Sequence, residues 1–137
     1  MQSSTLKSYA PVVLRIGITL VMVWFGSQQL LHPEKWTGFL PDWAGSLPLS
    51  AIAFIKLNGL FEVVAGILLL VGFRVRIIAG LLALHMAGIV MSVGYTPTGV
   101  RDFGLMVALI SMAMQGGDMW SYDIRKMQDQ SQDLAKY

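Results

Sequence analysis

The sequence contains no cysteine among its 137 residues. Disulfide bonds, thiol redox catalysis, iron–sulfur clusters held by thiolates and thiolate zinc sites are therefore excluded within this chain. No motif for a covalent cofactor is evident either. Any redox chemistry would need a bound cofactor or a partner protein.

The sequence is also poor in charge. Asp, Glu, Lys and Arg make up 13% of the residues, whereas a soluble domain carries about 25%. Hydrophobic residues make up 55%, which leaves too little polar surface for a soluble fold. The ten Lys and Arg residues are scattered and the net charge is only +2, so nothing indicates nucleic-acid binding. These deficits predict that the main partner of the chain is a lipid bilayer.

Four long apolar runs account for most of the sequence, at residues 11–31, 51–73, 77–95 and 103–119. A helix of about 20 residues crosses the hydrocarbon core of a bilayer and satisfies its backbone hydrogen bonds within its own segment. The first run is too long for a cleaved signal peptide, although Lys7 precedes it. We therefore predict an all-α protein, a single membrane domain over residues 1–137 that forms a bundle of four transmembrane helices.

The placement of basic residues predicts the orientation, because cytoplasmic segments carry an excess of Lys and Arg. Only Lys35, Lys56 and Arg101 fall on one side of the predicted bundle. We therefore expect both termini in the cytoplasm, in an inner (cytoplasmic) membrane, with residues 33–50 and 96–101 facing outward. The seven basic residues assigned to the cytoplasmic side are Lys7, Arg15, Arg74, Arg76, Arg125, Lys126 and Lys136.

The longest connection follows the first run, over residues 32–50. Its three prolines prevent one long regular helix. Trp36, Phe39 and Trp43 are of the aromatic type that favours the headgroup interface. The segment fits an interfacial flap, a lid over an outward-facing cavity, or a docking surface for a partner.

Each predicted helix carries a stripe of polar or small residues at three- and four-residue spacing, which places them on one face. Such faces allow close approach of helices and hydrogen bonds between them. The stripes therefore predict an interior with polar side chains. They consist of Arg15, Thr19, Met22, Gly26 and Gln29 in the first helix, Asn58, Glu62 and Ala65 in the second, His85, Gly88, Ser92 and Tyr95 in the third, and Gly104, Ala108, Ser111, Gln115 and Asp118 in the fourth.

Glu62 and His85 are expected at similar depth, near the middle of the membrane. Ionisable residues within spans are costly and usually face the bundle interior. One interpretation is structural, with an Arg15–Glu62 or a Glu62–His85 pair holding the helices in register. The other is functional: Glu62 and His85 hold or protonate the head group of an amphipathic ligand, because carboxylate and imidazole groups exchange protons near neutral pH.

The functional interpretation predicts a ligand pocket between the helices. No metal site is predicted, because a lone histidine within a span does not make one. The residues expected to line the pocket are Arg15, Gln29, Asn58, Glu62, His85 and Gln115.

A glycine-containing motif, GGDMWSYD, follows the fourth run. Its two glycines are expected to end the helix, and Trp120 to lie at the membrane interface. Ser121 or Asp123 is expected to cap a following short helix. Asp118 or Asp123 is expected to pair with an arginine of the turn between the second and third runs.

Four segments together resemble the DoxX family of small bacterial and archaeal membrane proteins. The likeness lies in an early Arg in the first helix, an inward Glu and a G-x-x-x-R turn in the second, and a closing G-x-x-W-S-x-D motif. The segments have the order and spacing of the family. They are LRIGITLVMVWFGSQQLLHPEKW, NGLFEVVAGILLLVGFRVR, RIIAGLLALHMAGIVMSVG and GGDMWSYDIRK.

The resemblance implies a four-helix integral membrane fold and an association with membrane redox chemistry. The relatives that give the family its name are subunits of a thiosulfate:quinone oxidoreductase. Carried over position by position, the resemblance points to Arg15, Glu62, Trp120, Ser121 and Asp123. The sequence departs from the family at the end of the first helix, where two glutamines replace a usual Lys, and this argues against anion binding there.

The main hypothesis is an accessory subunit of a membrane oxidoreductase, with a site for a quinone or a lipid-like ligand between the helices. Its partners would be other oxidoreductase subunits, and it would be enzymatic only as a subunit of a quinone-linked oxidoreductase.

Two alternatives stay open. One is a non-enzymatic scaffold that binds a partner protein through residues 32–50 or through a ridge of Ala79, Ala83 and Ala87, which also suits packing within the bundle or a homo-oligomer. The other is a small proton or solute transporter lined by the polar stripes, against which the absence of an inverted repeat counts.

Overall fold

The protein is all-helical in the computed structural model, which describes the backbone of residues 2–134 and the side chains of residues 6–134. The predicted all-α class is thus confirmed, while Lys136 lies outside the described residues. The elements are α1 (Gln2–Leu31), the short 3₁₀ helices η1 (Pro33–Phe39) and η2 (Asp42–Ser46), α2 (Ala51–Val71), α3 (Val75–Val93), α4 (Pro97–Gln115) and α5 (Tyr122–Leu134).

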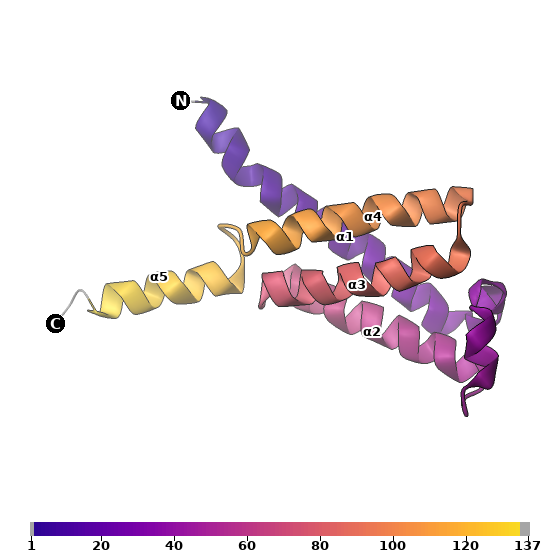
Figure 1. Ribbon diagram of the computed structural model, residues 1–137. Coiled ribbons are helices and arrows are strands. Elements are labelled where there is room, and N and C mark those ends of the chain that lie inside the picture. Colours follow the sequence, from indigo (N-terminus) through magenta and orange to yellow (C-terminus); the bar gives the residue numbers. More distant parts are fainter. Residues whose placement is uncertain (1, 135–137) are drawn as a thin grey trace.

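Helices α1 to α4 lie side by side, and each runs opposite to the one before it (Figure 1). Both chain ends therefore project from one end of the bundle, where α5 leads away from it. The short helices η1 and η2 cover the opposite end, next to the turn between α3 and α4. The short helix expected at the GGDMWSYD motif is α5, and its sequence is mainly polar.

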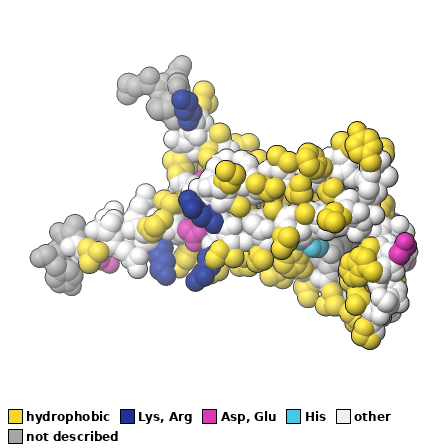
Figure 2. Space-filling model, viewed as in Figure 1, with side chains coloured by type: hydrophobic (Ala, Val, Ile, Leu, Met, Phe, Trp, Pro, Cys, Tyr) yellow, Lys and Arg dark blue, Asp and Glu magenta, His cyan; other side chains and the backbone are white. Residues whose placement is uncertain are grey.

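Among the described residues, three helical stretches are long and apolar enough to cross a membrane: Leu6–Leu31 of α1, Ala51–Val71 and Val75–Val93. Apolar side chains such as Leu20 and Met114 are exposed on the outside, which suits contact with lipid rather than water. Hydrophobic side chains cover the middle of the face seen in Figure 2, and basic side chains gather toward the end from which α5 projects. The chain is a multi-pass membrane protein.

The position of α4 differs from the sequence prediction of a span at residues 103–119. The helix begins at Pro97, because the side chain of Thr96 accepts a hydrogen bond from the backbone N–H of Gly99 and proline fits the first turn. It ends at Gln115, and Gly116 follows with a φ of 81°. Since α4 includes the charged residues Arg101 and Asp102, it is not one of the three candidate spans, and the four-span count is not confirmed.

The helices associate as two pairs, α1 with α2 and α3 with α4, and the contact between the pairs is much less extensive. In the first pair, Gly26 and Gly59 meet backbone to backbone. A Cβ atom on Gly26 would lie 2.6 Å from the carbonyl oxygen of Gly59, and one on Gly59 would lie 2.7 Å from that of Gly26. In the second pair, Ala79 and Ala83 are buried in the core, so this part of the alanine ridge packs within the bundle.

Arg15 is buried and joins three elements at the end of the bundle where the termini lie. Its Nε donates to Oδ2 of Asp118 at 2.6 Å. Its Nη1 donates to the carbonyl oxygens of Leu69 and Leu70, at 2.8 and 2.6 Å. A cation at the last carbonyls of α2 is favourable, because a helix C-terminus carries partial negative charge. The predicted Arg15–Glu62 pair is therefore wrong: Arg15 meets Asp118, which lies in the turn after α4.

The GGDMWSYD segment fastens α5 to the turn between α2 and α3. The carboxylate of Asp123 accepts the backbone N–H groups of Arg74 and Val75, at 2.9 and 3.0 Å. Asp123 thus caps the start of α3, whereas the sequence predicted that it would cap the short helix α5. Its carboxylate binds the backbone of Arg74 rather than the guanidinium of Arg74. Ser121 donates to the carbonyl oxygen of Asp118 at 2.7 Å, and Gly72 leaves no room for a Cβ beside Ser121.

We predict that Gly26→Ala destabilises the protein although alanine is the better helix former. The new Cβ overlaps the backbone of α2, and overpacking of this kind costs about 1–3 kcal/mol. Thermal unfolding in mild detergent measures the effect. Gly17→Ala is the matched control on α1, because no atom lies within 4 Å of its added Cβ. Equal melting temperatures for the two variants would contradict the close crossing.

We predict that Arg15→Met lowers the free energy of unfolding by about 3–5 kcal/mol, because it leaves the carboxylate of Asp118 buried without its cation. The side chains of Arg15 and Asp118 are 3% and 2% exposed. The double variant Arg15→Met/Asp118→Asn should recover part of this loss. A double-mutant cycle of unfolding free energies measures the coupling, and simple additivity of the two substitutions would argue against the pair.

Candidate functional site

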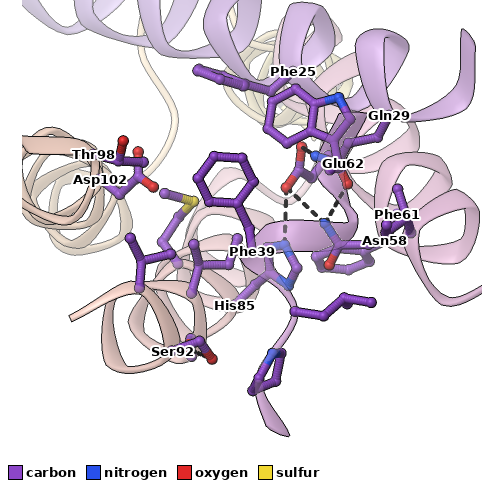
Figure 3. Close-up of a pocket in the computed structure, with 18 of the residues that line it drawn as sticks. Phe25, Gln29, Phe39, Asn58, Phe61, Glu62, His85, Ser92, Thr98 and Asp102 are labelled. Atoms are coloured by element: carbon purple, nitrogen blue, oxygen red, sulfur yellow. Dashed lines mark hydrogen bonds and ion pairs between the residues drawn. The ribbon is translucent and has the colours of Figure 1, made fainter. Parts of the chain in front are cut away.

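Glu62 lies inside the bundle, 2% exposed, and three side chains surround its carboxylate. Nε2 of Gln29 donates to Oε2 at 2.9 Å. Nδ2 of Asn58 donates to Oε1 at 3.2 Å, and Nε2 of His85 lies 3.1 Å from the same oxygen. The cluster thus joins α1, α2 and α3, and both carboxylate oxygens have partners (Figure 3).

Local helix geometry explains why these side chains meet. Asn58 and Glu62 are four residues apart on α2 and so lie on one face. Gly59, between them, lets α1 approach so closely that an added Cβ would lie 2.8 Å from the Cβ of Gln29. Nδ2 of Asn58 also donates to Oε1 of Gln29 at 2.6 Å. The two amides therefore hold each other and Glu62 in a fixed arrangement.

His85 is the one member of this cluster that combines a titratable ring with access to open space. Its side chain is 19% exposed. The ring of Phe61 contacts it edge-on, with centroids 5.0 Å apart. An ionised Glu62 only accepts hydrogen bonds, so Nε2 is the nitrogen that donates to it. Nδ1 has no hydrogen-bond partner in the part of the chain that the structure describes.

A cavity of about 1250 Å³, here called the central pocket, opens in front of this cluster. Figure 3 shows Glu62, Gln29, Asn58 and His85 together on one wall, with Thr98 and Asp102 of α4 across from them. The rest of the lining is rich in aromatic rings. These are Trp24, Phe25, Trp36, Phe39, Trp43, Phe54 and Phe61.

The segment η1–η2 contributes part of this aromatic lining. Trp36 packs against Phe25 of α1, with ring centroids 5.7 Å apart, and Trp43 packs against Phe54 of α2 at 5.9 Å. These contacts attach the segment to both helices of the first pair, beside the pocket. Of the interpretations offered by the sequence, the arrangement favours the lid.

The pocket also contains a charged pair that the sequence analysis did not assign to a site. Nε of Arg101 donates to Oδ1 of Asp102 at 2.8 Å, and its guanidinium lies over the ring of Phe25, 4.6 Å from the centroid. Asp102 is buried, 4% exposed. The sequence feature that could have indicated this pair is an acid next to a base at the start of an apolar run. Arg101 was instead placed in a loop, because the fourth helix was expected to begin later.

The structure brings together Gln29, Asn58, Glu62 and His85 of the predicted site residues. The other two lie elsewhere. Arg15 is bound to Asp118, and Gln115 is exposed and donates to Ser111 at 3.1 Å. Trp120, Ser121 and Asp123 belong to the turn and α5 at the end where the termini lie, away from the pocket.

The predicted polar stripes of the third and fourth helices are only partly correct. In α3, His85, Gly88 and Ser92 line the pocket, while Tyr95 is fully exposed. In α4 the buried residues are Gly99, Asp102, Leu109 and Met112, and none of these belongs to the predicted stripe. Ala108 of that stripe does pack against the core.

Within the described residues, no group of three or more His, Asp and Glu side chains is placed to hold a metal ion. The site instead offers amide and imidazole donors around one carboxylate, beside aromatic walls. Such a set suits a polar head group attached to an apolar body.

No curated protein and no solved structure matches the chain. The sequence model of the DoxX family matches residues 10–94. This stretch includes most of α1, both short helices, α2 and α3. It therefore contains the whole cluster of Gln29, Asn58, Glu62 and His85. Because the match covers more than half of its length, the chain belongs to the DoxX family.

Proposed function

We propose that the protein is an accessory subunit of a membrane oxidoreductase and that the central pocket binds the head group of a quinone or of a similar lipid-like ligand. The observation that carries the proposal is the Glu62–His85 pair on the wall of the pocket, with an unpartnered ring nitrogen beside the open space. A quinone would supply two-electron chemistry that takes up two protons.

The side chains fit such a head group. A carbonyl oxygen of the ligand needs a hydrogen-bond donor, and the protonated imidazole of His85 offers Nδ1–H for this purpose. Glu62 orients the ring and stabilises its positive charge from the other side, at 3.1 Å. Exchange of a proton between the carboxylate and the imidazole is general acid–base chemistry that these two groups perform well. Aromatic rings such as Trp36 and Phe39 offer flat faces for a planar ring.

The chain supplies the ligand site, and partner subunits supply the electrons. It has no cysteine to hold an iron–sulfur cluster. This division of roles makes it an accessory subunit rather than an enzyme by itself. Exposed apolar helix faces within the bilayer provide surface for other subunits or for a second copy.

We further propose four membrane spans, with both termini in the cytoplasm of a cell whose inner membrane holds the protein. Helix α4 packs along α3 over its length. Its two charges neutralise each other, because Arg101 pairs with Asp102 at 2.8 Å. Arg74, Arg76 and Arg125 lie at the end of the bundle where the termini lie, and an excess of basic residues marks the cytoplasmic side.

We predict that Glu62→Gln weakens binding of a benzoquinone to the purified protein by about tenfold or more, since a hydrogen bond to a charged group contributes about 1.5–3 kcal/mol. Titration in detergent, followed by the quenching of tryptophan fluorescence, measures the affinity. Glu34→Gln is the control with the same chemical change, on an exposed side chain of η1. Affinity that stays the same in Glu62→Gln while the variant remains folded would refute the ligand site.

We predict that the protein released from its own membrane in mild detergent carries additional mass in native mass spectrometry. A surplus equal to a quinone, or to another polypeptide with redox cofactors, is the expected result. A spectrum with only the bare chain, under conditions that retain known subunits of other complexes, would count against the role as a subunit.

A further inference from the structure

A second hollow lies on the outside of α2 and α3, and is here called the apolar groove. Its volume is about 310 Å³, and every residue that lines it is apolar. Its wall on α2 runs from Leu57 through Val64 to Leu68, a length of about 16 Å at the rise of an α-helix. On α3 it is lined by Ile78 and Leu81.

The apolar groove adjoins the central pocket. Phe61 and Leu81 line both cavities. Phe61 lies at the junction, because one side of its ring contacts His85. Contact between α2 and α3 is sparse compared with the contact within each helix pair, so the two helices leave space between their side chains here.

Two sides of the central pocket differ in chemistry. The route toward the end covered by η1 and η2 passes the charged side chains of Lys35, Asp42 and Arg101. The route past Phe61 meets only hydrocarbon, and the half-exposed side chains of Leu60 and Val64 place it at the outer surface of the helices. An apolar chain avoids desolvating charged groups and therefore follows the second route.

We propose that the apolar groove binds the hydrocarbon tail of the ligand whose head group lies beside Glu62 and His85. This inference rests on the proposed function and specifies the ligand class: an amphipath with a long alkyl or isoprenoid chain, rather than a small water-soluble quinone. The ligand reaches the pocket sideways from the bilayer, between α2 and α3. Phe61 separates the part of the site for the head group from the part for the tail.

The test compares two probes, 2,3-dimethoxy-5-methyl-1,4-benzoquinone and its 6-decyl derivative, which share the head group. The measured quantity is the ratio of their dissociation constants for the wild-type protein and for Val64→Trp, which fills the apolar groove. We expect the preference for the decyl compound to fall by about tenfold in Val64→Trp, equivalent to about 1.4 kcal/mol, because the indole ring fills the space that the tail occupies. Affinity for the tailless probe should stay the same.

Ile67→Trp is the matched control, since Ile67 lies on α2 with an exposure of 49% against 48% for Val64 but lines neither cavity. It should keep the wild-type preference. If both probes bind and Val64→Trp keeps the preference too, the tail site is refuted while the head-group site stands. If neither probe binds the wild-type protein, the proposed function fails and the tail site fails with it.

Discussion

Where α1 crosses α2, Gly26 and Gly59 place each backbone directly against the other. The arrangement of the site depends on this contact. A larger residue at either position would separate the helices, and Gln29 would then no longer reach the carboxylate of Glu62 at 2.9 Å. In a membrane, where water cannot serve as a substitute partner, loss of that donor would leave a buried charge underbonded. The polar cluster therefore depends on close helix packing, since the two glycines let Gln29 come within hydrogen-bond distance of Glu62.

The division into two helix pairs explains where the space for a ligand comes from. Tight packing within α1–α2 and within α3–α4 leaves the contact between the pairs incomplete, and the central pocket and the apolar groove both lie along that contact. The pairs need a connection elsewhere, and it lies at the opposite end from η1 and η2. There Arg15 joins α1 to the last carbonyls of α2 and to Asp118 after α4. A bundle fixed at one end can hold an open pocket at the other.

Prediction from the sequence was most accurate where the position of a residue on a helix face determines its burial. The helical spacing put Glu62 on the inner face of the second helix, and the structure confirms its burial. Prediction failed where the position of a residue depends on where a helix begins or ends. The fourth helix was placed by its apolar run, but the cap at Thr96 sets its start. Its packing against the bundle leaves Gln115 exposed. The sequence offered an Arg15–Glu62 pair or a Glu62–His85 pair, and the structure contains the second. Arg15 instead meets Asp118, which lies in a turn whose course no helical periodicity describes.

Burial of carboxylates gives the strongest physical reason to place the chemistry at Glu62. Three acidic side chains are buried in the described part of the chain: Glu62, Asp102 and Asp118. Asp118 has Arg15 and Asp102 has Arg101, so both have permanently charged partners. Glu62 has two neutral amides and His85. Arginine keeps its charge at physiological pH, whereas an imidazole gains and loses a proton near neutral pH. Asp102 lines the central pocket as well, but Glu62 is the buried carboxylate there whose partner is a titratable imidazole. This combination favours proton exchange with a ligand over helix register alone.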